Sequence, residues 1–392
     1  MLELPTTRAG AYVERVINGE RVQAFVAPPL PPVPKLKLTS EVHDLLEKAN
    51  RALGRLDGIT TLLPNTSFFI YNYVRKEAVL SSQIEGTQSS LSDLLLFESD
   101  EVPGVPLDDV IEVSNYVRAM EHGLARVRQD NFPLSSRLLK EIHALLLDSG
   151  RGSSKMPGEF RRAPVWLGGT RPSNAAFVPP PFEHISALMA NFEDFLHDQP
   201  ERTPTLIKAA LAHVQFETIH PFLDGNGRLG RLLITLLLCA EEVLTEPTLY
   251  LSLYFKTHRS DYYDALQRVR TEGDWEGWLA FFLSGVFDTA QQAFRTAQRL
   301  IELFDADRLR VETLGRMTGS ALQVLQVAQR RVLFSASDLD KDLSIALPTV
   351  RRSLDALEEL GIFREVTGKG RNRLWLYGDY LTILSEGTEP LR

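Results

Sequence analysis

Residues 220–231, reading HPFLDGNGRLGR, combine side chains suited to phosphate chemistry. The ordinary pKa of a histidine lies near neutrality, so His220 can accept a proton from an attacking hydroxyl group. Asp224 offers a carboxylate oxygen, the ligand that Mg²⁺ prefers beside phosphate groups, and a nucleotide supplies most of the remaining oxygens. The segment therefore predicts a general base and a metal ligand within one short loop.

Glycines and arginines in the second half of this segment predict an anion site. Gly225 and Gly227 lack side chains, so backbone amides can approach an anion closely. A helix that starts here adds free amides and its positive dipole end. Arg228 and Arg231 lie three residues apart on one helical face and can reach the more distal phosphates. The predicted nucleotide-binding residues in this loop are Gly225, Asn226, Gly227, Arg228, Leu229, Gly230 and Arg231.

Other interpretations of the loop fit the sequence less well. The glycines between 225 and 230 also satisfy GxGxxG, but a dinucleotide-binding turn needs a strand directly before it. Residues 206–219 instead place apolar side chains at helical spacing. A bare glycine-rich helix start would explain neither His220 nor the spaced arginines. His213 and His220 lack the spacing of a zinc site, so we expect His213 to be packed in the core.

Apolar residues recur at three- and four-residue spacing along most of the chain, which predicts a mainly α fold. Pro221 ends the helix before the loop, and a second helix follows it. The expected helices are 67–84, 91–97, 110–127, 136–147, 206–219 and 228–240, with one from Thr39 onward and others up to Leu303. The proline-rich segment 25–38 predicts an extended arm across the surface, and residues 165–178 predict a hairpin around Gly168 and Gly169.

Residues 337–377 have a different character, because two short helical patterns precede a strand-like pair, FREV and RLWLY. This order is typical of a winged helix-turn-helix. Residues 330–377 hold nine basic and seven acidic side chains, and Asp355, Glu358 and Glu359 would repel DNA phosphates. DNA binding is therefore not favoured over a protein-interaction or dimerisation role. The basic residues that could contact phosphates are Arg351, Arg352, Lys369, Arg371 and Arg373.

The composition bounds the setting in which this chain works. The chain has 392 residues and a net charge of −8, which argues against a globally basic surface that coats nucleic acid. Cys239 is its single cysteine, so an intramolecular disulfide is excluded. The N-terminus lacks the pattern of a signal peptide, and the most apolar stretch, 232–240, is too short to span a bilayer. These features predict a cytoplasmic protein without a membrane partner.

A second motif, SSQIEGT, occupies residues 81–87. Ser81 and Glu85 are spaced i, i+4, which places both on one helical face, and Gly86 allows the helix to end. Taken alone, this pattern is also typical of a solvated serine and glutamate near a helix end.

The loop resembles, at every fixed position, the signature HPFx[D/E]GNGRxxR of the Fic family. The segments PGEFRRAPVWLGG and AAFVPPP resemble that family's flap, which aligns a target segment by strand addition. The resemblance covers roughly residues 10–300. It implies a helical Fic core with a β-hairpin flap, and the C-terminal winged helix-turn-helix would follow. The expected division is an N-terminal arm and helices with an inhibitory helix at 1–100, the catalytic core at 101–300, a linker helix at 301–325 and the C-terminal domain at 326–392.

The resemblance implies an enzyme that transfers AMP from ATP to a Ser, Thr or Tyr hydroxyl of a protein. His220 would then deprotonate the acceptor and Asp224 would hold Mg²⁺ between the α- and β-phosphates. Asn226, with the glycine amides, would stabilise the transferred phosphoryl charge, and Arg228 and Arg231 would bind the distal phosphates. Tyr262 is the candidate adenine contact, with a core aromatic residue as the alternative.

The resemblance also gives Ser81, Glu85 and Gly86 a role, because they fit the inhibitory pattern [S/T]xxxE[G/N] of many Fic proteins. Glu85 paired with Arg231 would occupy the guanidinium group that should hold the γ-phosphate. The alternatives are removal of AMP from modified protein, transfer of another nucleotidyl or phosphoryl group, and a nucleotide-sensing transcription regulator. The expected partner is the protein that carries the acceptor hydroxyl, with a homodimer as the alternative to a monomer.

Overall fold

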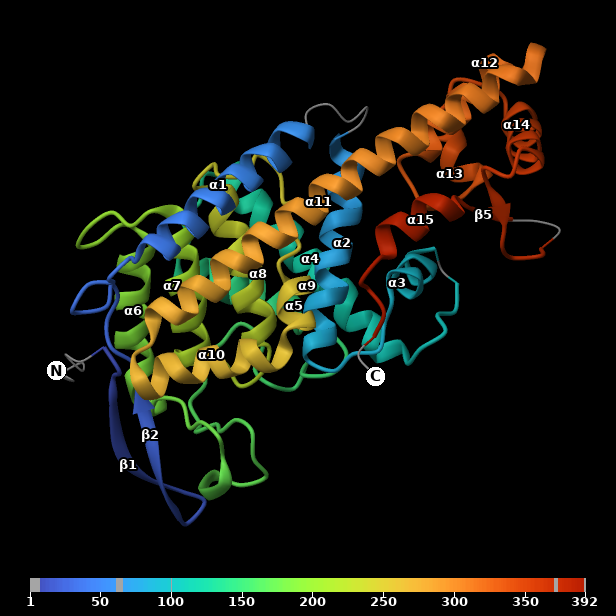
Figure 1. The fold of residues 1–392 in the computed structure, drawn as a ribbon. Helices are drawn as coiled ribbons and strands as arrows, with labels where there is room; N and C mark the ends of the chain where they lie inside the picture. The colour runs from blue at the N-terminus through green and yellow to red at the C-terminus, as the bar shows by residue number, and fades with distance from the viewer. Residues whose placement is uncertain (1–7, 61–65, 100, 370–372, 391–392) are drawn as a thin grey trace.

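A computed structural model describes residues 8–60, 66–99, 101–369 and 373–390. The chain is mostly helical, as the spacing of apolar residues predicts, and the part up to α11 is a stack of helices with a small hairpin at one end (Figure 1). The helices of this part are α1 (Ser40–Thr60), α2 (Thr66–Ile84), α3 (Leu91–Glu98), α4 (Leu107–Arg128), α5 (Ser136–Leu146), α6 (Ile185–Leu196), α7 (Thr205–Ile219), α8 (Asn226–Ala240), α9 (Ser252–Thr257), α10 (Arg259–Glu272) and α11 (Trp275–Val311).

The centre of the fold is the pair α7 and α8, which are buried on nearly all sides. Every residue from 206 to 219 is buried, because α4, α5, α6, α10 and α11 surround the pair. A helix that is apolar all round belongs in a core rather than on a surface. Its one lysine, Lys208, is fully buried and contacts Asp198 and Glu241, each at 2.7 Å. The loop between α7 and α8 is therefore held at both ends by deeply buried helices.

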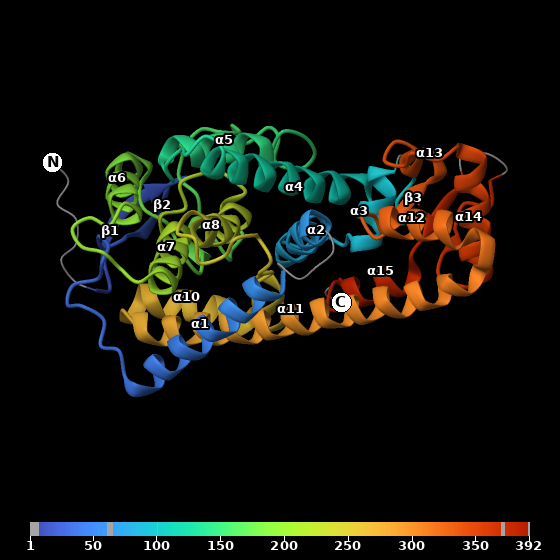
Figure 2. The same cartoon turned by 90° about the horizontal axis from the view of Figure 1, so that it is seen from above.

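The longest helix, α11, connects the helices α1–α10 with the C-terminal region that follows Val311 (Figure 2). Its 37 residues span about 55 Å, and α1 packs along its first part. Because α11 passes through residue 300 without a break, the boundary expected there falls within a helix. No helix in the described ranges is long and apolar enough to cross a membrane.

The N-terminal segment forms an antiparallel hairpin that the sequence analysis did not predict. Strands β1 (Ala11–Ile17) and β2 (Glu20–Val26) are joined by Asn18 and Gly19, both with positive φ. The proline-rich arm after β2 was expected on the surface, but its first part is buried. Gln215 donates a hydrogen bond to the Pro28 carbonyl at 2.7 Å, so the core itself satisfies the backbone of this arm.

The predicted hairpin at 165–178 is reduced to an isolated β-bridge between Leu167 and Phe177. A short 3₁₀ turn, η1 (Pro172–Asn174), occupies the intervening loop, and its prolyl ring fits a turn better than a strand. This flap is joined to the N-terminal hairpin, because the Phe25 amide donates to the Val178 carbonyl at 2.9 Å. The other 3₁₀ turn here, η2 (Phe182–His184), leads into α6.

The C-terminal region follows the predicted order of two short helices and a strand pair, with one further helix and strand before them. Its strands form a three-stranded sheet in the order β3-β5-β4. Tyr377 donates a hydrogen bond at 2.5 Å to the buried Asp307 of α11, which fixes this region to the long helix. Its elements are η3 (Glu312–Met317), α12 (Thr318–Ala328), β3 (Leu333–Ser335), α13 (Ala336–Asp340), α14 (Leu347–Glu359), β4 (Arg364–Glu365), β5 (Leu374–Leu376) and α15 (Gly378–Ser385).

The chain after β5 returns to the N-terminal helices and lies against α2 (Figure 1). Asn72 donates to the Tyr380 hydroxyl at 3.0 Å, and Gln83 donates to the Thr388 carbonyl at 2.8 Å. Lys256 of α9 donates to the Gly387 carbonyl at 3.0 Å. Residues 380–388, expected within a separate C-terminal domain, thus brace the helix that carries Ser81.

Candidate active site

Two residues in the left-handed backbone region shape the loop between α7 and α8. α7 ends at His220, with φ 50° and ψ 60°, and α8 begins after Gly225, with φ 75°. Few non-glycine residues adopt such a backbone, and they gather at constrained functional sites. A helix, not a strand, leads into the glycines, so residues 205–231 do not form a dinucleotide-binding turn.

Buried side chains hold the loop backbone in place. Asn226 donates to the Phe222 carbonyl and accepts from the Phe222 amide, both at 2.9 Å. Arg161 donates to the His220 carbonyl at 2.8 Å and to the Pro180 carbonyl at 2.6 Å. The Asn226 amide group is thus engaged with the loop itself, which differs from the phosphate contact that the family resemblance implies.

His143 of α5, which sequence reasoning missed, holds the backbone of Asp224 by a hydrogen bond. Its Nδ1 accepts a hydrogen bond from the Gly158 amide at 2.8 Å, so Nε2 carries the proton and donates to the Asp224 carbonyl at 3.0 Å. Its ring stacks on Phe222 with 3.8 Å between ring centroids. Burial lowers the pKa of His143 to about 4, which keeps the ring neutral and this hydrogen-bonding arrangement fixed.

His220 is the group in this site best suited to accept a proton. Burial, followed by the charges of Arg161 and Arg270, lowers its pKa to about 3, so the imidazole is neutral near pH 7. The backbone of Glu217 is a hydrogen-bonding neighbour of the ring and opposes this shift without reversing it. The side chain is partly exposed, and a neutral, partly exposed imidazole beside an anion site has the chemistry of a general base.

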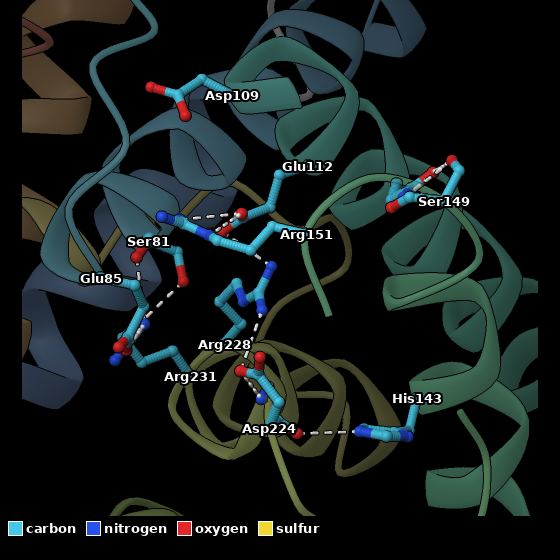
Figure 3. A network of polar contacts seen from close by, with 12 residues as sticks. Ser81, Glu85, Asp109, Glu112, His143, Ser149, Arg151, Asp224, Arg228 and Arg231 are labelled. Carbon is cyan, nitrogen blue, oxygen red and sulfur yellow. Dashed lines mark hydrogen bonds and ion pairs between the residues drawn. The ribbon is translucent and has the colours of Figure 1, made fainter. Parts of the chain in front are cut away.

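Ser81 and Glu85 both bind Arg231, which is 2% exposed (Figure 3). The guanidinium donates to the Ser81 hydroxyl at 2.9 Å, to the Ser81 carbonyl at 3.0 Å and to the Glu85 carboxylate at 2.6 Å. Burial opposes ionisation of Glu85, but Arg231 outweighs it, so the pKa of Glu85 is lowered. Gly86, with φ +101°, allows the chain to turn away directly after this contact.

The glycines of the loop are required by close contacts. A Cβ atom at Gly227 would lie 2.2 Å from Oε1 of Glu85, so the space beside this glycine is taken by the carboxylate. A Cβ atom at Gly230 would lie 3.0 Å from Oε1 of the buried Glu217. Leu229 is fully buried and contributes to the core rather than to an anion site.

Arg228 is held by a carboxylate that sequence reasoning also missed. Glu112 of α4 is 1% exposed and lies 2.8 Å from Nη1 of Arg228, and it accepts two hydrogen bonds from Arg151, at 2.9 and 3.1 Å. Nη2 of Arg228 lies 3.5 Å from Asp224 (Figure 3). Arg228 thus sits between the predicted metal ligand and a buried acid.

Asp224 is compatible with Mg²⁺ only as a partner of bound phosphates. Its side chain is 39% exposed and accepts a hydrogen bond from the Gly225 amide at 2.6 Å. Among the described residues, no group of three or more His, Cys, Asp and Glu side chains is arranged for a metal ion. A single carboxylate with phosphate oxygens and water is a common way to hold Mg²⁺.

Tyr262, the predicted adenine contact, is a core residue here. It is 1% exposed, stacks on Phe255 and shares a 2.8 Å hydrogen bond between its hydroxyl and Nε2 of His213. His213 is fully buried, as predicted. Tyr263, the residue next to Tyr262 in the sequence, is 42% exposed and offers the more accessible aromatic ring for a nucleobase.

The basic residues of the C-terminal region are partly neutralised. Arg373 contacts both Asp355 and Glu358 at 3.1 Å, and Lys369 contacts Glu101. Arg371 lies outside the described residues. Arg351 and Arg352 are exposed on α14. These pairs reduce the positive charge available to DNA phosphates, and the winged-helix assignment and its partner stay predictions.

Two segments of the chain match models of known protein families. Residues 43–125 match the family described as Fic/DOC family N-terminal, and residues 133–238 match the Fic/DOC family. The chain is 34% identical over 201 residues to proteins named "Protein adenylyltransferase Fic" from Culex quinquefasciatus and Aedes aegypti, and 31% identical to that from Drosophila melanogaster. The match covers 50% of this chain but 37% of each of those proteins.

Solved structures support the same fold. A Fic family protein from Desulfovibrio desulfuricans G20 is similar with a TM-score of 0.57, at 21% identity, over 87% of this chain and 97% of that one. Fic-1 from C. elegans is similar with a TM-score of 0.51, at 23% identity, over 67% of this chain and 74% of that one. At these identities the likeness concerns the fold alone.

Proposed function

Because the chain belongs to the Fic family, we propose that it transfers AMP from ATP to a Ser, Thr or Tyr hydroxyl of a protein, in a Mg²⁺-dependent reaction. The observation that carries the proposal is His220. Its neutral, partly exposed imidazole lies just before the start of α8, and the buried Arg161 holds its backbone carbonyl. A nucleotide sensor would not need a base in this position.

In this reaction His220 accepts the proton of the acceptor hydroxyl as its oxygen attacks the α-phosphorus of ATP. The bond from that phosphorus to the bridging oxygen breaks, and pyrophosphate leaves with the electron pair. The amides at the start of α8 and the guanidinium of Arg228 stabilise the charge that develops on phosphate oxygens. Asp224 would hold Mg²⁺, which neutralises the charge of the phosphates when it is bound. The chain thus positions the reacting groups and neutralises the charge on the phosphate oxygens.

We further propose that α2 inhibits this activity. The carboxylate of Glu85 occupies Arg231, which the distal phosphates of ATP would otherwise bind. Since Arg231 also donates two hydrogen bonds to Ser81, ATP would have to compete with three contacts. A nucleotide bound without Arg231 would place its α-phosphorus poorly for attack, and poor alignment alone lowers the rate strongly.

A second activity, removal of AMP from modified protein, is favoured by one observation. The pKa of Glu85 is lowered, so this carboxylate is ionised at neutral pH and lies beside Gly227 in the loop. In that position it could orient a water molecule against the phosphorus of an AMP-protein ester. The cytoplasmic location and a possible homodimer stay predictions from the sequence.

Incubation with α- and γ-labelled ATP tests the main proposal. We expect protein-bound label from α-labelled but not γ-labelled ATP, and its loss in His220→Ala. Glu85→Gly should raise incorporation at least about tenfold, because it removes a charged hydrogen bond to Arg231. Glu47→Gly is the control, since it removes an exposed glutamate from a surface contact with Arg51.

Three results would contradict these proposals. Label that comes from γ-labelled ATP alone would show phosphoryl transfer instead of AMP transfer. Full incorporation in a folded His220→Ala variant would show that His220 is not the general base. Equal incorporation in Glu85→Gly and Glu47→Gly would rule out inhibition by α2.

A further inference from the structure

We propose that Arg151 is a third guanidinium group of the phosphate site and binds the pyrophosphate part of the nucleotide, with Glu112 holding it in place. This inference rests on the proposed function. No sequence motif discussed above includes Arg151 or Glu112.

The turn that carries Arg151 forms one wall of the site. Gly150 and Gly152 flank it, both with positive φ, and they bend the chain back after α5. A Cβ atom at Gly152 would lie 3.0 Å from Oδ2 of Asp224, so this backbone passes directly beside the predicted metal ligand. Arg151 therefore starts from a point in contact with the loop.

Glu112 joins Arg151 to Arg228. One of its oxygens lies 2.8 Å from Nη1 of Arg228, and the other accepts hydrogen bonds from Nε and Nη2 of Arg151. Figure 3 shows the carboxylate between these two guanidinium groups. Two cations share this anion, but Asp224 lies 3.5 Å from Arg228, so the four side chains keep a positive charge for an incoming anion only when Mg²⁺ engages Asp224.

Both arginines keep donors for such an anion. Arg228 is 3% exposed, yet its Nε and Nη1 make no aligned hydrogen bond with any described residue, although Nη1 is close to Glu112. A guanidinium has five N–H donors, and Arg151 uses two bonds for Glu112 while its side chain stays 53% exposed. Buried, unsatisfied donors beside an accessible guanidinium fit a polyanion better than a neutral ligand.

Pyrophosphate is the ligand class that this charge pattern selects. The β- and γ-phosphates, which leave as pyrophosphate, carry most of the negative charge of ATP, whereas the acceptor hydroxyl is neutral. Arg151 also lies on the accessible side of the site, where a leaving group can depart. We expect Arg151 to act on the anhydride end of the nucleotide and not on the adenosine end.

The test measures binding of inorganic pyrophosphate by calorimetry, with and without Mg²⁺, in the Glu85→Gly background in which Arg231 is released. Arg151→Gln should weaken pyrophosphate binding about tenfold, the effect of one lost charged hydrogen bond, and leave adenosine binding unchanged. Arg151→Lys should recover part of the loss. The control is Arg118→Gln, since Arg118 is also half exposed and pairs with Asp148 at 3.0 Å.

Unchanged pyrophosphate binding in Arg151→Gln, or a loss of the same size in Arg118→Gln, would overturn the inference. So would the absence of pyrophosphate binding in the parent with intact Arg151. Failure of the proposed function is distinguishable, because it appears as absent α-label incorporation in that same parent. A thermal unfolding curve for each variant ensures that only folded proteins are compared.

Discussion

The two arginines of α8 face two carboxylates in very different settings. Arg231 and Arg228 are both buried and lie one helical turn apart, and each contacts a glutamate from another helix, at 2.6 and 2.8 Å. Glu85, the partner of Arg231, lies just beyond the end of α2 with its side chain 34% exposed. Glu112, the partner of Arg228, lies inside α4 and is 1% exposed.

This difference separates a removable contact from a permanent one. Gly86 ends the segment that carries Glu85, so this carboxylate can leave Arg231 by a change in a short stretch of chain. Glu112 cannot leave Arg228 unless α4 separates from the core. The same ion-pair chemistry therefore forms the proposed inhibitory contact on one side of the loop and a buried structural contact on the other.

The largest expected effect is on stability. Glu112→Ala should lower the free energy of unfolding by about 3–5 kcal/mol, because it leaves the buried charge of Arg228 without its close partner. Glu85→Ala should cost less than about 2 kcal/mol, since Arg231 keeps both bonds to Ser81. Urea denaturation measures both values. Equal losses would mean that the two pairs have the same structural role.

A smaller effect is expected at Ser81, the other residue by which α2 and the segment after it contact Arg231. Ser81→Ala removes a neutral acceptor from Arg231 and keeps the Glu85 carboxylate, so we expect incorporation of α-label to rise about fivefold, corresponding to about 1 kcal/mol. The increase should stay below that of Glu85→Gly. A larger increase in Ser81→Ala would transfer the main inhibitory role from the charged contact to the hydroxyl.

The smallest expected effect concerns pH and has opposite signs for the two acids. The pKa of Glu85 is lowered below its ordinary 4.5, so the stability that it contributes is present above this value and is lost as pH falls through the folded pKa. The pKa of Glu112 is raised, mainly by burial, so its contribution is greatest below 4.5 and declines as pH rises.

Urea denaturation of Glu85→Gln and Glu112→Gln beside the parent, from pH 7 to pH 3, measures these contributions. As pH falls, the parent should lose its advantage over Glu85→Gln and gain relative to Glu112→Gln. Parallel curves for the two variants would contradict the assigned directions.

The sequence predicted the loop and most helices because both depend on local pattern. Residues 220–231 are contiguous, and the helices show regular apolar spacing. The N-terminal hairpin also had a local signal, the two-residue Asn18-Gly19 turn, which is typical of hairpins and was overlooked. The expected surface arm was wrong in its first part because Gln215 supplies a buried partner for the Pro28 carbonyl.

Other parts of the site had no local signal. Glu112 and His143 become important only through contacts with the loop, across 116 and 81 residues of chain, and Arg151 only through its bonds to Glu112, 39 residues away. Each sits in a segment without a motif. Tyr262 shows the converse case. Two adjacent tyrosines are equivalent in sequence, but the fold buries Tyr262 against His213 and exposes Tyr263.

The brace on α2 also has a consequence in time. Gln83 and the Thr388 carbonyl that it binds are 305 residues apart. At about 5–20 residues per second, a ribosome needs about 15–60 s to make the intervening chain. α7, α8 and the loop between them leave the ribosome before residues 380–388 do. Each newly made molecule therefore passes through an interval in which α2 is held by Arg231 and its helical neighbours alone.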